Sequence, residues 1–328
     1  MNVATDCDQV LDELRQADKL LLTTHENPDG DALGSLLAMH QILTLLGKDS
    51  VMFMAEDEFP LPYEYRHLNF TGVLNAPPED VNERTIVFLD CGNIDRMPVD
   101  FLQQDHLHLL NIDHHHDNTR FGTVNLVVPE ASCTAEIVFR LAKELGVEIT
   151  LPVADALYVA LVTDTGRFMY ENTGPEAHRM AAELIELGVE PHEVYRRLYE
   201  DLPFARLQLL ARALDRVRRY DGGALTVTYL TRQDYDETGS VETDSEGIVD
   251  HIRAVENTKV AALVRDLLAE ERVGIRKVSL RATDGSVDVS RIARAHGGGG
   301  HRQAAGFSTE LPVEELVERL RVELGEQL

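Results

Sequence analysis

The sequence contains little cysteine, and its three thiols, Cys7, Cys91 and Cys133, are too few and too scattered for a disulfide framework. No apolar run approaches the ~20 residues that are needed to cross a bilayer, so no membrane partner is expected. The first residues lack a basic stretch followed by an apolar core, which argues against a signal peptide. These absences predict a soluble, cytoplasmic protein.

Basic residues are also scarce, with 31 lysines and arginines against 57 aspartates and glutamates, which gives a formal net charge of −26. Such a surface repels long nucleic acid. If the substrate is a nucleotide, it should therefore be short and held by a local basic pocket.

The length of 328 residues allows two domains, and 44% hydrophobic residues are enough for real cores. Residues 1–190 alternate between strand and helix patterns, which predicts a mostly parallel sheet flanked by helices. The predicted strands are residues 20–24, 51–55, 85–89 and 107–112, and the predicted helices are residues 32–46 and a second one capped by Ser132.

Residues 191–218 are helical in pattern and rich in arginine, which predicts a helical connector. Residues 219–328 then predict a second, smaller α/β domain. Its predicted strands are residues 224–230, 260–268 and 274–281, and its predicted helices are residues 287–296 and 313–324.

Acidic and histidine side chains follow four apolar segments of the first domain, which we interpret as four strand ends. The set consists of His25, Asp29, Asp31, Asp90, Asp113, His114, His115 and Asp164. Each residue alone would be an ordinary cap or turn residue, but the ordered set predicts a site for hard divalent cations. Two such ions ~3.5–4 Å apart can share a carboxylate and activate water for attack on a phosphate ester.

The spacing His25-x3-Asp29-x-Asp31, then Asp90, Asp113-His114-His115 and Asp164, resembles the four motifs of the DHH phosphoesterase superfamily over the whole first domain. The resemblance implies two divalent cations, with Mn²⁺ expected and Mg²⁺ as the alternative. It also implies the ligands: His25 and Asp29 for one ion, Asp31, His114 and Asp164 for the other, and Asp90 between them.

By the same resemblance, His115 and Asp113 would be the catalytic residues beside the ions. His115 would contact the substrate phosphate, and Asp113 would orient a neighbouring histidine.

Four consecutive glycines, residues 297–300, precede His301, and a backbone without Cβ atoms can approach a ligand closely. The run resembles the GGGH…AAG motif of the DHH-associated domain, which lies across a cleft from the catalytic domain. The resemblance places the active site in this interdomain cleft and implies substrate binding by Gly298, Gly299, Gly300 and His301. It assigns a terminal phosphate to Arg281, and Arg96 is a further candidate because it lies close to Asp90 in the sequence.

Two enzymatic readings stay open. The preferred one resembles the bacterial nanoRNase and pAp phosphatase group, which cleaves short 5′-phosphorylated oligonucleotides and removes the 3′-phosphate of 3′,5′-adenosine bisphosphate (pAp). The alternative is a phosphodiesterase for cyclic di-AMP or pApA. A non-catalytic nucleotide-binding module is the third reading, but no ligand position is missing. Family members are often dimers, so a homodimer is left open.

Overall fold

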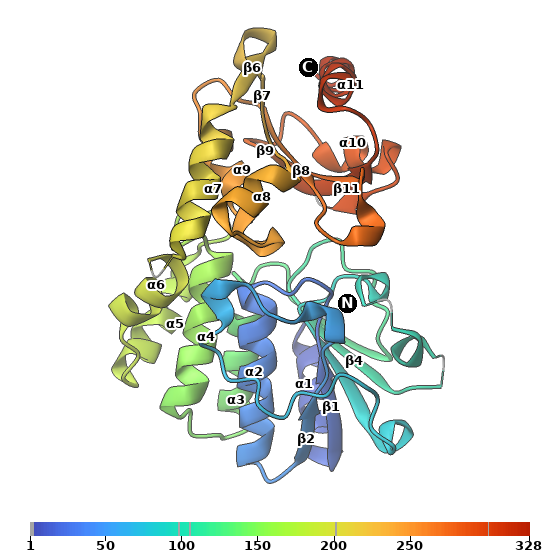
Figure 1. The fold of residues 1–328 in the computed structure, drawn as a ribbon. Coiled ribbons are helices and arrows are strands. Elements are labelled where there is room, and N and C mark those ends of the chain that lie inside the picture. Colours follow the sequence, from blue (N-terminus) through green and yellow to red (C-terminus); the bar gives the residue numbers. More distant parts are fainter. Residues whose placement is uncertain (1–2, 98, 105, 201, 301) are drawn as a thin grey trace. The chain divides into compact units, whose positions relative to one another are not determined.

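The computed structural model describes residues 3–97, 99–104, 106–200, 202–300 and 302–328. The chain divides into two compact units, Met1–Asp201 and Leu202–Leu328, which we call the first and the second unit (Figure 1). The division falls between helices α6 (Pro191–Tyr199) and α7 (Phe204–Asp215). The predicted limits of the two domains and of the connector remain predictions.

The first unit is built on a five-stranded sheet in the order β2-β1-β3-β4-β5, and every neighbouring pair is parallel. The prediction of a mostly parallel sheet flanked by helices is therefore confirmed. Besides α6, the elements are α1 (Val3–Gln16), β1 (Lys19–Thr23), α2 (Gly30–Leu45), β2 (Asp49–Met52), β3 (Thr85–Leu89), β4 (Leu109–Asp113), β5 (Val124–Val127), α3 (Thr134–Glu144), α4 (Leu151–Asp164) and α5 (Pro175–Glu186).

Both faces of this sheet are buried, which explains why its central strands are continuous apolar runs. Leu20, Leu22 and Val87 pack on one face in a core shared with α1 to α4. Leu21 and Phe88 point to the other face, where they pack against the segment of residues 94–107. The sheet is thus fixed from both sides, and its strand ends are rigid positions for functional side chains.

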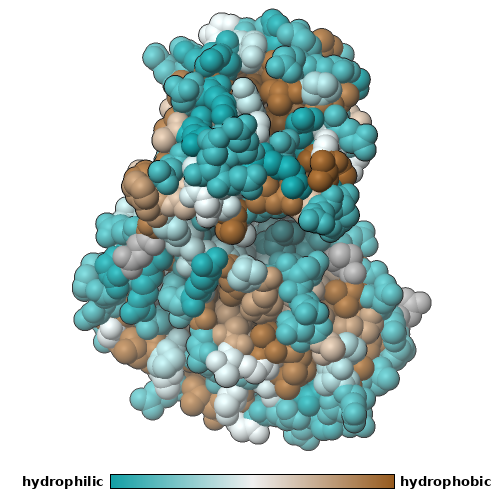
Figure 2. Space-filling view, in the orientation of Figure 1, coloured by the Kyte–Doolittle hydropathy of each residue, from teal (hydrophilic) through white to brown (hydrophobic). Residues whose placement is uncertain are grey.

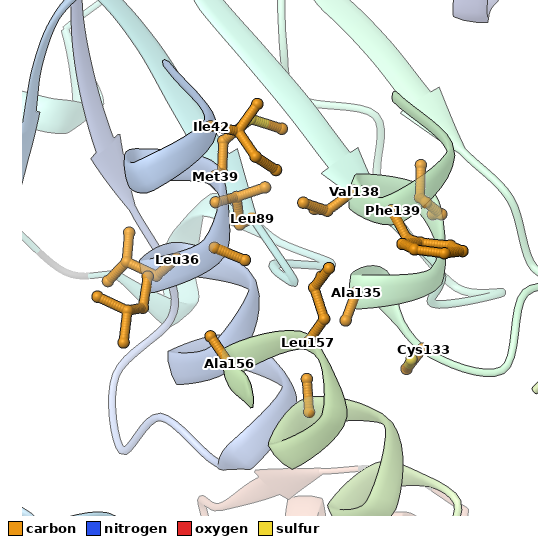
Figure 3. Close-up of a cluster of buried hydrophobic side chains, with 14 of the residues drawn as sticks. Leu36, Met39, Ile42, Leu89, Cys133, Ala135, Val138, Phe139, Ala156 and Leu157 are labelled. Carbon is orange, nitrogen blue, oxygen red and sulfur yellow. The ribbon is translucent and has the colours of Figure 1, made fainter. Parts of the chain in front are cut away.

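Helices α2 and α4 lie close together because α2 has glycine where they meet. A Cβ on Gly34 would lie 2.4 Å from the carbonyl oxygen of Ala156, and one on Gly30 would lie 2.2 Å from Oγ1 of Thr163. Figure 3 shows the apolar side chains that fill the neighbouring space between α2, α3 and α4, among them Leu157. This contact brings the start of α2 beside the end of α4.

The second unit contains a six-stranded mixed sheet in the order β10-β11-β9-β8-β7-β6, in which only β7 and β8 pair in parallel. One face packs against α10 and α11, and part of the other packs against α7, α8 and α9. The elements after α7 are β6 (Arg218–Tyr220), β7 (Leu225–Leu230), α8 (Arg232–Thr238), α9 (Ile248–Arg253), β8 (Val260–Asp266), β9 (Arg276–Ala282), α10 (Val289–Ala295), β10 (Gly299–Gly300), β11 (Ala304–Thr309) and α11 (Val313–Gly325). The prediction of a second α/β domain is confirmed.

Two local predictions are wrong. Ser132 does not cap the helix that follows it, because α3 begins at Thr134 and its N-cap is Cys133. Asp164 does not end a strand, because it is the last residue of α4. This segment is buried over most of its length, so its apolar residues reveal no helical period, and its length of 14 residues is the feature that marks a helix.

None of the helices that the structure describes is both long and apolar enough to span a membrane. The face of the molecule in Figure 2 carries mostly hydrophilic side chains with scattered apolar ones, as the large number of charged residues would suggest.

Candidate metal centre

The predicted ligands gather at the carboxyl ends of three adjacent strands, β1, β3 and β4. His25 and Asp29 follow β1, Asp90 follows β3, and His114 follows β4. Parallel strands end at the same edge of a sheet, so residues far apart in sequence meet there. The start of α2 and the end of α4 bring two further carboxylates, those of Asp31 and Asp164.

Three groups of side chains have ligand atoms within 4.8 Å of one another: His25, Asp29 and Asp90; Asp31, His114 and Asp164; and Asp90, His114 and His115. The first two groups coincide with the two ligand sets that the family resemblance implies. Asp90 and His114 connect the groups, since Nε2 of His114 lies 3.6 Å from Oδ1 of Asp90. Nε2 of His25 lies 3.7 Å from the other carboxylate oxygen of Asp90. The structure thus brings all six predicted ligands together, and their coordination of metal remains a prediction.

The histidine rings are oriented through their Nδ1 atoms. Nδ1 of His114 lies 3.3 Å from the carbonyl oxygen of Ala131, and its Nε2 lies 3.7 Å from Asp164. Nδ1 of His115 lies 2.7 Å from Oδ1 of Asp113, which is fully buried. Asp113 therefore has the contact that its predicted orienting role requires. Histidine ligands commonly donate one ring N–H to a carbonyl or carboxylate in this way.

Without cations, this pocket is crowded with negative charge. Burial, and then the charges of Asp90 and Asp164, raise the pKa of Asp31 well above its ordinary value. Burial raises the pKa of Asp164 to about 7, with Asp29 and Asp90 adding to the rise and His114 opposing it. Bound divalent cations would relieve this repulsion.

Asp90 behaves differently from the other two acids. Burial alone would raise its pKa, but the interaction with His25 and the charges of His115 and His114 hold the pKa well below its ordinary value. Its backbone has a φ of +57°, a left-handed conformation that is uncommon for a residue with a side chain. Such strain tends to occur at functional sites, and here it turns the carboxylate at the end of β3 toward three histidines.

The donor set fits hard divalent cations. Carboxylate oxygens and imidazole nitrogens suit Mn²⁺, and Mg²⁺ accepts the oxygen donors. Asp31 is fixed by three donors, since Ser35 Oγ and the backbone N–H of Ala135 donate to Oδ1 and the N–H of Thr134 donates to Oδ2. Asp29 caps α2 by accepting from backbone N–H groups of its first turn. The carboxylates are therefore held in place without a cation.

Arg96 also lies at this cluster, as the prediction of a site role requires. Its Nη2 lies 3.0 Å from Nδ1 of His25. The thiol of Cys91, which follows Asp90 in the sequence, is fully buried, and burial raises its pKa to about 12. Burial and the raised pKa favour a packing role for Cys91 over that of a reactive thiol.

The remaining predicted substrate residues belong to the second unit. Arg281 lies on β9 opposite Ala304 of β11, and its Nε is 4.0 Å from Oδ1 of Asp250. By strand alternation, Ser279 and its partner Gly306 share the face of Arg281, so the sheet carries small residues beside this cation.

Gly299 and Gly300 form β10, and His301 lies outside the described residues. A Cβ on Gly298 would lie 2.2 Å from the carbonyl oxygen of Gly306, and one on Gly300 would lie 2.6 Å from that of Ala304. A Cβ on Gly299 would meet nothing within 4 Å. Gly298 and Gly300 are thus needed for close backbone packing, and the ligand role of all three glycines stays a prediction.

Sequence reasoning missed two side chains that support the cluster. Thr134 Oγ1 donates to Oδ1 of Asp90 at 3.0 Å, and Asn172 Nδ2 donates to Oδ2 of Asp164 at 3.1 Å. Neither residue stands near its partner in a recognisable pattern, so no local signal in the sequence points to them.

The parallel sheet with an acid and histidine cluster at its carboxyl edge is an arrangement typical of a metal-dependent hydrolase. Residues 19–161 match the DHH family N-terminal domain, and residues 223–328 match the DHHA1 domain. The chain is also 35% identical over 315 residues to the bifunctional oligoribonuclease and PAP phosphatase NrnA of Thermus thermophilus, a match that covers 94% of this chain and 90% of the relative. The chain therefore belongs to the DHH family of phosphoesterases, as its motifs indicate.

Solved structures agree with this assignment. An exopolyphosphatase-related protein of Bacteroides fragilis superposes with a TM-score of 0.86 at 25% identity, over 98% of this chain and 96% of that protein. RecJ of Thermus thermophilus in complex with Mn²⁺ superposes with a TM-score of 0.57 at 15% identity, over 98% of this chain and 54% of RecJ. The likeness to RecJ shows a shared fold only.

Proposed function

We propose that the protein hydrolyses short 5′-phosphorylated oligonucleotides to nucleoside monophosphates and removes the 3′-phosphate of pAp. The observation that carries this proposal is the pair of neighbouring ligand groups, His25, Asp29 and Asp90 beside Asp31, His114 and Asp164. Nε2 of His114 in one group lies 3.6 Å from Oδ1 of Asp90 in the other. The two activities in the name of the Thermus thermophilus relative, which matches nearly the whole chain, support the choice of substrates.

His25 and Asp29 would hold one divalent cation, Asp31, His114 and Asp164 the other, and Asp90 both. Bound there, the cations would activate a water molecule and neutralise charge on the phosphoryl oxygens. Mn²⁺ is the preferred ion because the donor set mixes imidazole with carboxylate. The Mn²⁺ complex of RecJ, a protein of the same fold, is consistent with this choice.

The chain's own residues would position the substrate. Asp113 fixes the ring of His115, which would contact a phosphoryl oxygen from beside the cluster. Arg96 would neutralise a second phosphoryl oxygen, since a guanidinium can donate two parallel hydrogen bonds. Arg281 and the glycines of residues 298–300 would hold the other end of a short substrate, which requires the second unit to face the cluster across a cleft.

The net charge of −26 supports a short substrate over a long nucleic acid, because only local cations could then hold the phosphates. The homodimer and the cytoplasmic location that the sequence suggests remain predictions.

The direct test supplies Mn²⁺ and, in separate reactions, a 5′-phosphorylated dinucleotide, pAp, cyclic di-AMP or pyrophosphate, and separates the products by chromatography. We expect nucleoside monophosphates from the dinucleotide and AMP from pAp, with no turnover in EDTA. Cleavage of cyclic di-AMP or pyrophosphate with neither expected product would contradict the proposal. The Asp90→Ala variant serves as the control for contaminating nucleases.

A further inference from the structure

Residues 131–135 comprise the end of the loop after β5 and the first two residues of α3, and they contain none of the predicted ligands but touch several of them. All five side chains are buried. The segment lies beside the cluster because α3 packs into the core of the first unit, where Ala135 and Val138 lie near Leu157 of α4 (Figure 3).

Thr134 connects two carboxylates of the cluster. Its backbone N–H donates to Oδ2 of Asp31 at 2.6 Å, and its hydroxyl donates to Oδ1 of Asp90 at 3.0 Å. The N–H of Ala135 donates to the other oxygen of Asp31 at 3.0 Å. Thr134, which is fully buried, thus fixes Asp31 relative to Asp90. Asp31 is predicted to bind one cation, and Asp90 is predicted to bind both.

The carbonyl groups of the same segment orient the remaining ligands of that cation. The carbonyl oxygen of Ala131 lies 3.3 Å from Nδ1 of His114. The carbonyl oxygen of Ser132 accepts from Nδ2 of Asn172 at 2.8 Å, and the same amide group donates to Oδ2 of Asp164 at 3.1 Å. If Nδ1 of His114 carries the hydrogen and donates it to the carbonyl oxygen of Ala131, Nε2 is unprotonated and its lone pair is free to bind a cation.

The segment is itself held rigidly. The backbone N–H of Ser132 donates to Oε2 of Glu136 at 2.9 Å, and this glutamate, only 3% exposed, pairs with Arg140. A support that is locked by packing and hydrogen bonds can hold ligand geometry more tightly than a free loop.

We propose that residues 131–135 are the common support of four predicted cation ligands, Asp31, Asp90, His114 and Asp164, and that Thr134 is a positioning residue that fixes Asp90 relative to Asp31. This inference rests on the proposed function, since it assigns supporting residues to the same cation site. Loss of such supporting contacts typically lowers metal affinity or activity about 10- to 100-fold.

The test compares Thr134→Val, which removes the hydroxyl and keeps the shape, with Thr134→Ser, which keeps the hydroxyl. Thr226→Val is the matched control, because Thr226 is also fully buried and its hydroxyl is hydrogen-bonded to the hydroxyl of Thr258 at 2.7 Å. Both threonines belong to the second unit, which contains none of the predicted cation ligands. Each protein is stripped with EDTA, checked for folding by thermal unfolding, and titrated with Mn²⁺ by calorimetry. The kcat and KM for a 5′-phosphorylated dinucleotide are then measured.

We expect Thr134→Val to bind Mn²⁺ about 10- to 100-fold more weakly and to lose kcat by a similar factor, with KM changed less than about twofold. Thr134→Ser should restore both values, and Thr226→Val should leave both unchanged. Asn172→Ala, in an exposed segment, should also weaken Mn²⁺ binding, and it tests the support even if Thr134→Val does not fold.

Wild-type Mn²⁺ affinity and kcat in a folded Thr134→Val protein would overturn the positioning role while leaving the proposed function intact. A folded Thr134→Ser protein with the same loss of Mn²⁺ affinity and kcat as Thr134→Val would also overturn the positioning role. If Thr134→Val does not fold, wild-type Mn²⁺ affinity in Asn172→Ala would overturn the proposed support by residues 131–135. A wild-type chain that neither binds Mn²⁺ nor cleaves the dinucleotide would overturn the proposed function and, with it, this inference.

Discussion

Replacing Asp164 by asparagine should stabilise the cation-free protein at neutral pH, although it removes a predicted metal ligand. Asp164 stands at the end of α4, where burial raises the pKa of its carboxyl group to about 7 from an ordinary value of 3.8. Asparagine has nearly the same shape and carries no charge. Its side-chain oxygen can still accept the hydrogen bond that Asn172 donates to Oδ2 of Asp164.

The magnitude follows from the difference of about 3 units between the two pKa values. The unfolded chain releases this proton near pH 3.8, whereas the folded chain keeps it until about pH 7. As pH rises between these values, the wild-type protein loses stability by about 1.4 kcal/mol per unit, on the order of 4 kcal/mol in total. The asparagine variant has no such loss, so its advantage grows over this range and then levels off.

Urea unfolding in EDTA at about pH 5 and about pH 8 measures this advantage, which should be about 3 kcal/mol larger at the higher pH. Asp155→Asn is a control on the same helix, and it should show a smaller change, because Asp155 lies outside the cluster. Mn²⁺ should reverse the order, since it stabilises the wild-type protein more than the Asp164→Asn variant. An advantage independent of pH would refute the reasoning, and so would equal stabilisation of both proteins by Mn²⁺.

Three further changes test other parts of the structure. Asp90→Ala should abolish turnover of a 5′-phosphorylated dinucleotide because it removes the carboxylate that is predicted to bind both cations, and kcat within about tenfold of wild type would contradict the bridging role. Gly298→Ala should lower the free energy of unfolding, measured in urea, by about 1–3 kcal/mol, since its Cβ would lie 2.2 Å from the carbonyl oxygen of Gly306. An unchanged midpoint of urea unfolding would contradict this, because it would show that the two backbone segments can move apart without cost. Asp234→Asn should cost about 3 kcal/mol, because this buried carboxylate pairs with Arg216, which helps to hold its pKa well below the ordinary value. That cost is present above about pH 4 and should shrink as pH falls below it, and a cost independent of pH would contradict the ion pair.

The ends of β3 and β4 could be predicted from sequence because each strand is a short apolar run that stops at a charged residue, whereas β5 is not among the predicted strands. Residues 85–89 end at Asp90, and β4 contains the apolar run that ends at Asp113. Strands buried on both faces need no polar alternation, so the run itself marks the strand. The first acid after such a run then lies at the edge where ligands bind in parallel sheets.

The supporting residues could not be predicted in this way. Thr134 lies 103 residues from Asp31 in sequence and 44 residues from Asp90. Only the packing of α3 against the sheet brings these groups within hydrogen-bonding distance, and threonine at the start of a helix is ordinary by itself. The same holds for Asn172, which reaches Asp164 from a segment without regular structure.

Gly30, beside the predicted ligands, has a packing role that the sequence alone does not reveal. The stretch Pro28-Asp29-Gly30 alone would be an ordinary turn, yet Gly30 belongs to α2 and lies against Thr163 of α4. Any larger side chain there would move α2 away from α4, and with it the carboxylate of Asp31 away from Asp164. The spacing of glycine and acid in this motif therefore sets a distance between two helices, and that distance is a condition for one cation to contact ligands from both.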